Sequence, residues 1–297
     1  MTERSLPVVG GVDHRWIDVD GVSLHVAEAG VSHRSASRPS LVLVHGWPQH
    51  WFCWRHVMPA LSETHHVVAI DLRGAGWSDV PAGVEAYDKR VIADEVARAL
   101  EVLELDRPVL VGHDWGAWTS LLVASRHPGA VRGVVAAAIV APWESIPWHH
   151  MWRFAYQPIA GGVGGAFLQR RAGQVLLKTI FRGGAARGFR WERGDRAEYL
   201  ARFREPARAK AGESLYRSFM LREMPALGRG QYARRVTDVP LLFLPGEGDL
   251  VLAPSLVRRA AGPPNVTVTE IEGSGHWIPE EKPADLIGHV RDFLRRF

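Results

Sequence analysis

Short runs of apolar residues, each ending in a polar turn, recur along the chain and predict the strands of a buried sheet. These runs cover residues 41–44, 67–70, 109–111, 131–140, 241–244 and 266–271. Apolar residues recur at helical spacing over residues 50–61, 87–104, 115–126 and 282–297. The repeated alternation of strand and helix favours an α/β fold with a doubly wound, mostly parallel sheet and right-handed crossovers.

The pattern changes near the beginning and in the second half of the chain. Residues 16–19 and 24–28 alternate around an Asp-Gly turn, which is typical of a β-hairpin. Residues 142–235 contain no convincing strand and are helical where they are periodic. We therefore predict a core formed by residues 1–141 and 236–297, into which a helical cap over 142–235 is inserted.

Composition and charge narrow the class of protein. The chain has 297 residues and a formal net charge of +4, which is enough length for one α/β domain with an insertion. The excess of Lys and Arg lies in residues 145–235 and no nucleic-acid-binding motif accompanies it, so we expect solvated helical faces and no nucleic-acid partner. No apolar run is long enough to span a membrane and the N-terminus lacks a signal-peptide pattern, which predicts a cytoplasmic protein.

The sequence carries no pattern for a metal or an organic cofactor. Cys53 is the single cysteine, so it has no cysteine partner for an internal disulfide or a metal site, and we expect it in or near the core. No glycine-rich phosphate-binding motif is present either, and we therefore expect no cofactor.

The strongest chemical signal is Gly112-His-Asp-Trp-Gly116, directly after a predicted strand and before a predicted helix. This is the pattern of a nucleophile elbow, in which glycines allow the sharp turn that exposes the central residue, here Asp114. A carboxylate can displace a leaving group from a saturated carbon and form an ester that water then cleaves. The alternative is that Asp114 simply caps the helix over 115–126.

Two further stretches follow predicted strands and supply the partners of such a nucleophile. The carboxyl ends of parallel strands meet at one edge of the sheet, so Asp249 and His276 are expected near Asp114. Nucleophile, acid and histidine also occur in the order that this kind of fold uses. Asp249 would orient His276, and His276 would take a proton from the water that attacks the ester.

The loop His45-Gly-Trp-Pro48 also follows a strand and is expected beside the elbow. There the backbone N–H groups of Trp47 and Trp115 would form an oxyanion hole, while His45 holds the loop by hydrogen bonds.

Taken together, these motifs resemble those of the α/β-hydrolase-fold epoxide hydrolases and the related haloalkane dehalogenases over essentially the whole chain. The resemblance rests on His45-Gly-Trp-Pro48, Asp71-Leu-Arg-Gly-x-Gly-x-Ser78, Gly112-His-Asp-Trp-Gly116, Asp249 and His276. It implies an α/β-hydrolase fold with an inserted helical cap and a covalent ester on Asp114.

Epoxide hydrolases of this family use two cap tyrosines to hold and protonate the epoxide oxygen. Tyr216 resembles the second of them. Counting back from Gln157-Pro158 places Trp152 at the first position, with Tyr156 nearby but out of register. The resemblance thus implies Tyr216 as the acid, and Trp152, Tyr156 and Trp115 as substrate contacts.

The resulting hypothesis is an epoxide hydrolase that converts a small apolar epoxide and water to a vicinal diol. A haloalkane dehalogenase is the first alternative, because the indole N–H groups of Trp115 and Trp152 could bind a halide. Fluoroacetate dehalogenases place arginines where Trp115 and Trp118 stand, which argues against an anionic substrate. The second alternative is a non-catalytic binding protein of the same fold, which would need no intact relay. The sequence predicts no oligomeric state.

Overall fold

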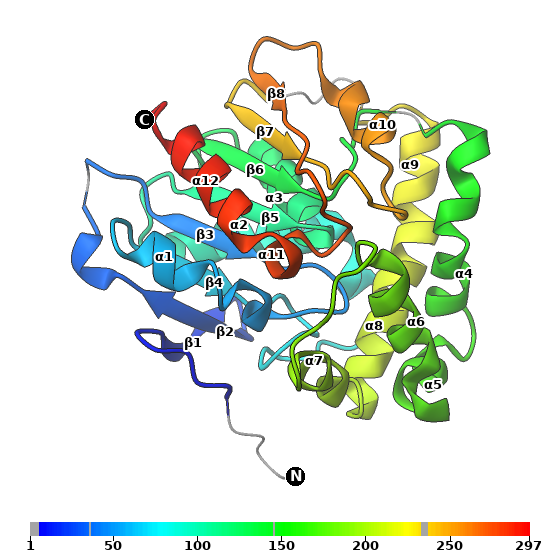
Figure 1. The fold of residues 1–297 in the computed structure, drawn as a ribbon. Coiled ribbons are helices and arrows are strands. Elements are labelled where there is room, and N and C mark those ends of the chain that lie inside the picture. The colour runs from blue at the N-terminus through cyan, green and yellow to red at the C-terminus, as the bar shows by residue number, and fades with distance from the viewer. Residues whose placement is uncertain (1–5, 36, 145, 233–236) are drawn as a thin grey trace.

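A single mixed sheet of eight strands forms the centre of the molecule (Figure 1). The computed structural model describes residues 6–35, 37–144, 146–232 and 237–297. The strand order is β1-β2-β4-β3-β5-β6-β7-β8. The strands are β1 (Asp13–Val19), β2 (Val22–Ala29), β3 (Leu41–Val44), β4 (Val67–Ile70), β5 (Val109–His113), β6 (Gly133–Ala137), β7 (Leu241–Leu244) and β8 (Val266–Val268). β2 pairs antiparallel with β1 and β4, and all other neighbours are parallel, which confirms the predicted sheet.

Helices cover both faces of this sheet. Figure 1 shows α12 in front of the strands and α3 behind them, where α3 packs against α2. The helices are α1 (Met58–Ser62), α2 (Lys89–Val102), α3 (Trp115–Arg126), α4 (Tyr156–Gly161), α5 (Gly165–Arg170), α6 (Val175–Gly184), α7 (Asp195–Arg202), α8 (Pro206–Ser218), α9 (Met224–Gly228), α10 (Pro254–Val257), α11 (Ile278–Glu281) and α12 (Pro283–Leu294). Strands β3, β4 and β5 are buried along their whole length, because both of their faces are covered.

The helices α4 to α9 lie between β6 and β7 in the chain and gather on one side of the sheet (Figure 1). Within the described part of residues 142–235 there is no strand, as the sequence predicted. Helix α8 packs against both α4 and α5. A π-helical turn, Phe219–Glu223, connects α8 to α9.

Three predictions of local structure were too long. The segment 50–61 forms a 3-10 turn (Trp51–Trp54) and then α1, instead of one helix. β6 ends at Ala137 because Ala138 takes a left-handed conformation, with φ 49°. β8 ends at Val268, and only an isolated bridge joins Ile271 to Gly246.

The predicted place of the single cysteine is confirmed, since Cys53 is fully buried in the core. Over the described ranges, no helix combines the length and the apolar character that crossing a bilayer requires.

Candidate active site

Asp114 stands at the turn between β5 and α3, in a backbone conformation that few residues other than glycine adopt. Its φ and ψ are 51° and −124°. Gly116 makes this turn possible, because a Cβ there would lie 2.0 Å from the carbonyl oxygen of Val44. The side chain of Asp114 makes no capping hydrogen bond to α3, so the capping alternative is wrong. The carboxylate is instead free to face the helical insertion.

Backbone donors of the β3 loop hold one oxygen of this carboxylate. The N–H of Trp47 donates to Oδ2 of Asp114 at 2.9 Å. The loop approaches so closely that a Cβ on Gly46 would lie 2.4 Å from the Cβ of Asp114. Burial raises the pKa of Asp114 to about 6, while His276 and the N–H groups of Trp115 and Trp47 act in the opposite direction. The carboxylate is therefore ionised at neutral pH.

His276 lies between Asp114 and Asp249, as the order of the motifs predicted. Its Nε2 is 3.8 Å from Oδ1 of Asp114, and its Nδ1 is 2.9 Å from Oδ2 of Asp249. The other oxygen of Asp249 accepts the N–H groups of Val251 and Leu252 at 2.7 and 2.9 Å. Asp249 is thus fixed by its own loop, and it fixes the imidazole in turn.

The charge of His276 depends on both carboxylates. Burial alone lowers the pKa of His276, but Asp249 and, more weakly, Asp114 raise it to about 9. The resting pair is therefore a carboxylate and an imidazolium. Removing the negative charge of Asp114 removes one of the interactions that keep the imidazole protonated.

Two residues that the sequence analysis did not single out hold His276 in place. The Nε2 of His113 lies 2.7 Å from the carbonyl oxygen of His276, and burial lowers the pKa of His113 to about 3, so the neutral ring donates this bond. Glu281 accepts the N–H groups of Gly275 and Trp277, on either side of His276, at 2.6 and 3.1 Å. His113 could have been noticed, because it directly precedes the nucleophile.

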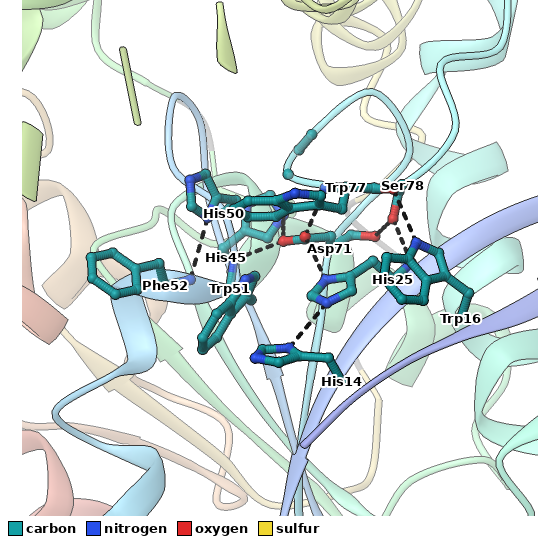
Figure 2. Close-up of polar contacts among 12 residues, drawn as sticks. His14, Trp16, His25, His45, His50, Trp51, Phe52, Asp71, Trp77 and Ser78 are labelled. Atoms are coloured by element: carbon teal, nitrogen blue, oxygen red, sulfur yellow. Dashed lines mark hydrogen bonds and ion pairs between the residues drawn. The ribbon is translucent and has the colours of Figure 1, made fainter. Parts of the chain in front are cut away.

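A second buried cluster, centred on Asp71, lies next to the loop that follows β3 (Figure 2). Asp71 is fully buried, and its carboxylate accepts the N–H groups of Trp51 and Trp77 at 2.7 and 3.0 Å. Nδ1 of His25 lies 2.8 Å from the same carboxylate. His45 Nδ1 bonds the carbonyl oxygen of Gly46 at 2.9 Å, while its Nε2 accepts the N–H of Leu72 at 3.0 Å. The bonds of His45 are those of a residue that holds a turn.

Two tyrosines of the insertion, the buried Tyr216 and the partly buried Tyr156, lie near Asp114. Tyr216, on α8, and Tyr156, at the start of α4, have ring centroids 5.7 Å apart. Both line one cavity with Asp114 and His276. Burial raises the pKa of both phenols, and the negative charge of Asp114 adds to the shift, so both hydroxyl groups stay protonated.

Trp152 and Tyr156 are the two residues considered for the first tyrosine position, and the structure shows how each lies relative to Tyr216. Trp152 is 66% exposed at the rim of the same cavity, and its ring stacks on the guanidinium of Arg153. Of these two residues, Tyr156 is the one for which a ring contact with Tyr216 is present. Trp152 lies in the 3-10 segment (Trp148–Phe154) before α4 and lines the same cavity as Asp114, so its role as a substrate contact stays a prediction.

Trp115 lies directly after the nucleophile and contacts both the core and the insertion. Its ring centroid is 5.8 Å from that of Tyr216 and 4.8 Å from that of Phe219. Its indole nitrogen is buried and has no hydrogen-bond partner among the described residues. The ammonium group of Lys89 lies 4.6 Å from the centre of the Trp115 ring and donates to the carbonyl oxygen of Leu215 at 2.8 Å. Lys89 thereby links the elbow to the residue before Tyr216.

Comparisons with known proteins identify the family of this chain. The model of a family described as alpha/beta hydrolase fold matches residues 39–283. Epoxide hydrolase A of Mycobacterium tuberculosis is 29% identical, over 96% of this chain and 98% of the relative. The crystal structure of Cfl2 from Burkholderia cenocepacia is 30% identical, with a TM-score of 0.81 and 98% of each chain covered.

Epoxide Hydrolase A from Mycobacterium thermoresistibile has a similar structure, with a TM-score of 0.79, 25% identity and coverage of 96% of this chain and 98% of that one. The names of these relatives and the fold they share with this chain together support a hydrolytic activity. The family match spans most of the sequence and includes strands β3 to β8. The chain therefore belongs to the alpha/beta hydrolase fold family.

Proposed function

We propose that this protein is an epoxide hydrolase that forms a covalent ester on Asp114. The observation that carries the proposal is the pair of phenols, Tyr156 and Tyr216, that line the same cavity as Asp114. Two neutral O–H donors opposite a carboxylate suit a leaving group that stays attached to the substrate and needs a proton. The epoxide hydrolases among the relatives support the same activity. Residues 142–235 act in this proposal as the cap that brings the phenols to the nucleophile.

Ring opening is the first step. Oδ2 of Asp114 is engaged by the N–H of Trp47, so the other oxygen, Oδ1, attacks the epoxide carbon. The C–O bond of the ring breaks, and the oxygen takes the proton of Tyr216 while Tyr156 donates a hydrogen bond. The product is a hydroxyalkyl ester, and the imidazolium of His276 returns a proton to the Tyr216 phenolate through solvent.

Ester hydrolysis is the second step. Esterification removes the negative charge of Asp114, which lowers the pKa of His276 and favours the neutral base that the step requires. His276 takes a proton from water, and the hydroxide adds to the ester carbonyl, whose oxygen lies in the oxyanion hole formed by the N–H groups of Trp47 and Trp115. Collapse releases the diol, which takes a proton from His276, and the proton on the new carboxyl group then returns to His276.

A haloalkane dehalogenase is the second candidate, favoured by the buried and unpartnered indole nitrogen of Trp115. Such a donor could bind a leaving halide. The other donor of that hypothesis, Trp152, is largely exposed, and a halide leaving group needs no phenolic acid. A non-catalytic binding protein has less support, because the bonds from Asp249 to His276 and the ion pair to Asp114 serve no receptor function.

Intact mass spectrometry of a His276→Gln variant tests the proposal. The variant lacks the base, so it should retain the first intermediate when it is incubated with epoxides or with haloalkanes. A mass increase equal to the whole epoxide is the expected result. An adduct equal to an alkyl group without its halogen, and none with epoxides, would favour the dehalogenase. The double variant Asp114→Asn/His276→Gln is the matched control and should form no adduct in either panel.

A further inference from the structure

Two cavities of unequal size meet at the nucleophile. The larger has a volume of about 620 Å³ and the smaller about 200 Å³. Asp114, Tyr156 and Val251 line both of them, so the carboxylate and one phenol stand at their junction. The smaller cavity also contains Tyr216 and His276. A substrate whose reactive carbon lies at Asp114 would therefore extend into two spaces of different size.

The walls of the larger cavity are mostly apolar. They come from α3, from the segment after β6 and from the end of the insertion. The lining residues include Trp118, Ile139, Trp143, Phe219, Met224 and Leu227. The volume lies within the range of about 300 to 1,000 Å³ that encloses drug-sized ligands. This is more space than the small epoxide expected from the sequence needs.

The charges around the larger cavity are unfavourable for an anion. Among the described residues that line it, none is Lys, Arg or His, and the carboxylate of Glu144 contributes to the wall. Glu144 has the guanidinium of Arg259 at 3.5 Å. A substrate carboxylate in this cavity would lose its hydration without gaining a cationic partner from these residues.

We infer that the substrates are epoxides with one bulky, uncharged apolar substituent, which occupies the larger cavity, and a small or absent substituent on the other side. This inference rests on the proposed function of Asp114. It names the substrate class that the activity alone leaves open. Because the two cavities meet at the nucleophile, the substituent is buried while the ring is attacked, and its binding energy contributes to kcat/KM.

A series of terminal epoxides from 1,2-epoxybutane to 1,2-epoxydodecane measures this contribution. Burial of one methylene group is worth about 0.8 kcal/mol, so kcat/KM should rise about fourfold per added methylene until the cavity is full. The anion 10,11-epoxyundecanoate should react at least about tenfold more slowly than uncharged 1,2-epoxyundecane. A flat series, or a preference for the carboxylate, would overturn the inference.

A variant that fills the larger cavity locates the effect. Leu227→Trp should lower the ratio of kcat/KM for 1,2-epoxydodecane to that for 1,2-epoxybutane by at least about tenfold. Met224→Trp, at a partly exposed position of the same wall, is a second test should the first variant fold poorly. The matched control is Leu221→Trp, because Leu221 is 66% exposed on the same segment and does not line the cavity, so the ratio should stay unchanged.

The failure of this inference can be told apart from the failure of the proposed function. If the His276→Gln variant forms the ester with short and long epoxides at equal rates, only the substrate class is wrong. If it forms no ester with any epoxide, both proposals are wrong. If the ratio of kcat/KM for 1,2-epoxydodecane to that for 1,2-epoxybutane is the same in Leu227→Trp and Leu221→Trp, the larger cavity does not bind the substituent.

Discussion

Replacing Asp249 with Asn is expected to stop hydrolysis of the ester on Asp114 while the ester still forms. One carboxylate oxygen of Asp249 accepts two backbone N–H groups, at 2.7 and 2.9 Å, and the other faces Nδ1 of His276 at 2.9 Å. An asparagine must keep its oxygen toward the two donors, because an NH2 group there would face two N–H groups. Its NH2 group therefore faces His276.

The consequence is a change of tautomer. Nδ1 of His276 must accept the amide N–H, so the ring proton moves to Nε2, the nitrogen that faces Asp114. A protonated Nε2 cannot take a proton from water. General-base catalysis of this kind is worth about 10² to 10⁴ in rate, so ester hydrolysis should slow by about 10³, equivalent to ~4 kcal/mol in the barrier.

Single-turnover mixing with an epoxide, followed by intact mass measurement, resolves the two steps. In Asp249→Asn the ester should reach nearly one equivalent and then decay slowly. In the unmodified enzyme the decay should accelerate as pH rises through the pKa of His276, which lies below about 9 once the ester has neutralised Asp114. Asp285→Asn, on the exposed start of α12, is the control. Decay at the rate of the unmodified enzyme in Asp249→Asn would refute the reasoning.

Three other variants test the remaining parts of the site. Tyr216→Phe and Tyr156→Phe should each slow ester formation by about 10² or more, measured in the same single-turnover assay, and leave the decay of the ester much less affected. Gly46→Ala would place a Cβ 2.5 Å from the nucleophile's Oδ2, so ester formation should fall below detection while circular dichroism still reports a folded chain. Lys89→Met removes a buried ammonium that donates to the carbonyl before Tyr216, and should lower the free energy of urea unfolding by about 1.5 to 3 kcal/mol and reduce kcat/KM. The control Lys178→Met, at an exposed position of α6, should do neither.

The central strands could be predicted from the sequence because both faces of each are buried. Three strands have the same bounds as the predicted apolar runs, namely 41–44, 67–70 and 241–244. The run 131–140 was longer than its strand for a different reason. Ile139 and Val140 are apolar because they line the larger cavity, not because the strand continues. An apolar run therefore marks burial, and burial beside a site looks the same in a sequence as burial in a strand.

The proximity of Asp114, Asp249 and His276 could also be predicted, because each follows a strand and parallel strands end at a common edge. In the structure His276 lies 3.8 Å from Asp114 and 2.9 Å from Asp249. The contact of His113 with the carbonyl oxygen of His276 could not be predicted, since the two residues lie 163 positions apart in the chain. Spacing along the chain carries no information about such a distant contact.

The contact between Tyr156 and Tyr216 could not be predicted from the sequence. Which aromatic residue meets Tyr216 depends on how α4 packs against α8, and a count of residues does not contain that contact. The packing is close, because a Cβ on Gly161 of α4 would lie 2.6 Å from the backbone nitrogen of Arg217 on α8. Gly161 is the last residue of α4 and Tyr156 is the first, so this close approach fixes the end of the short helix that carries Tyr156. A glycine that lets two helices approach each other is a packing signal, and a count of residues does not use it.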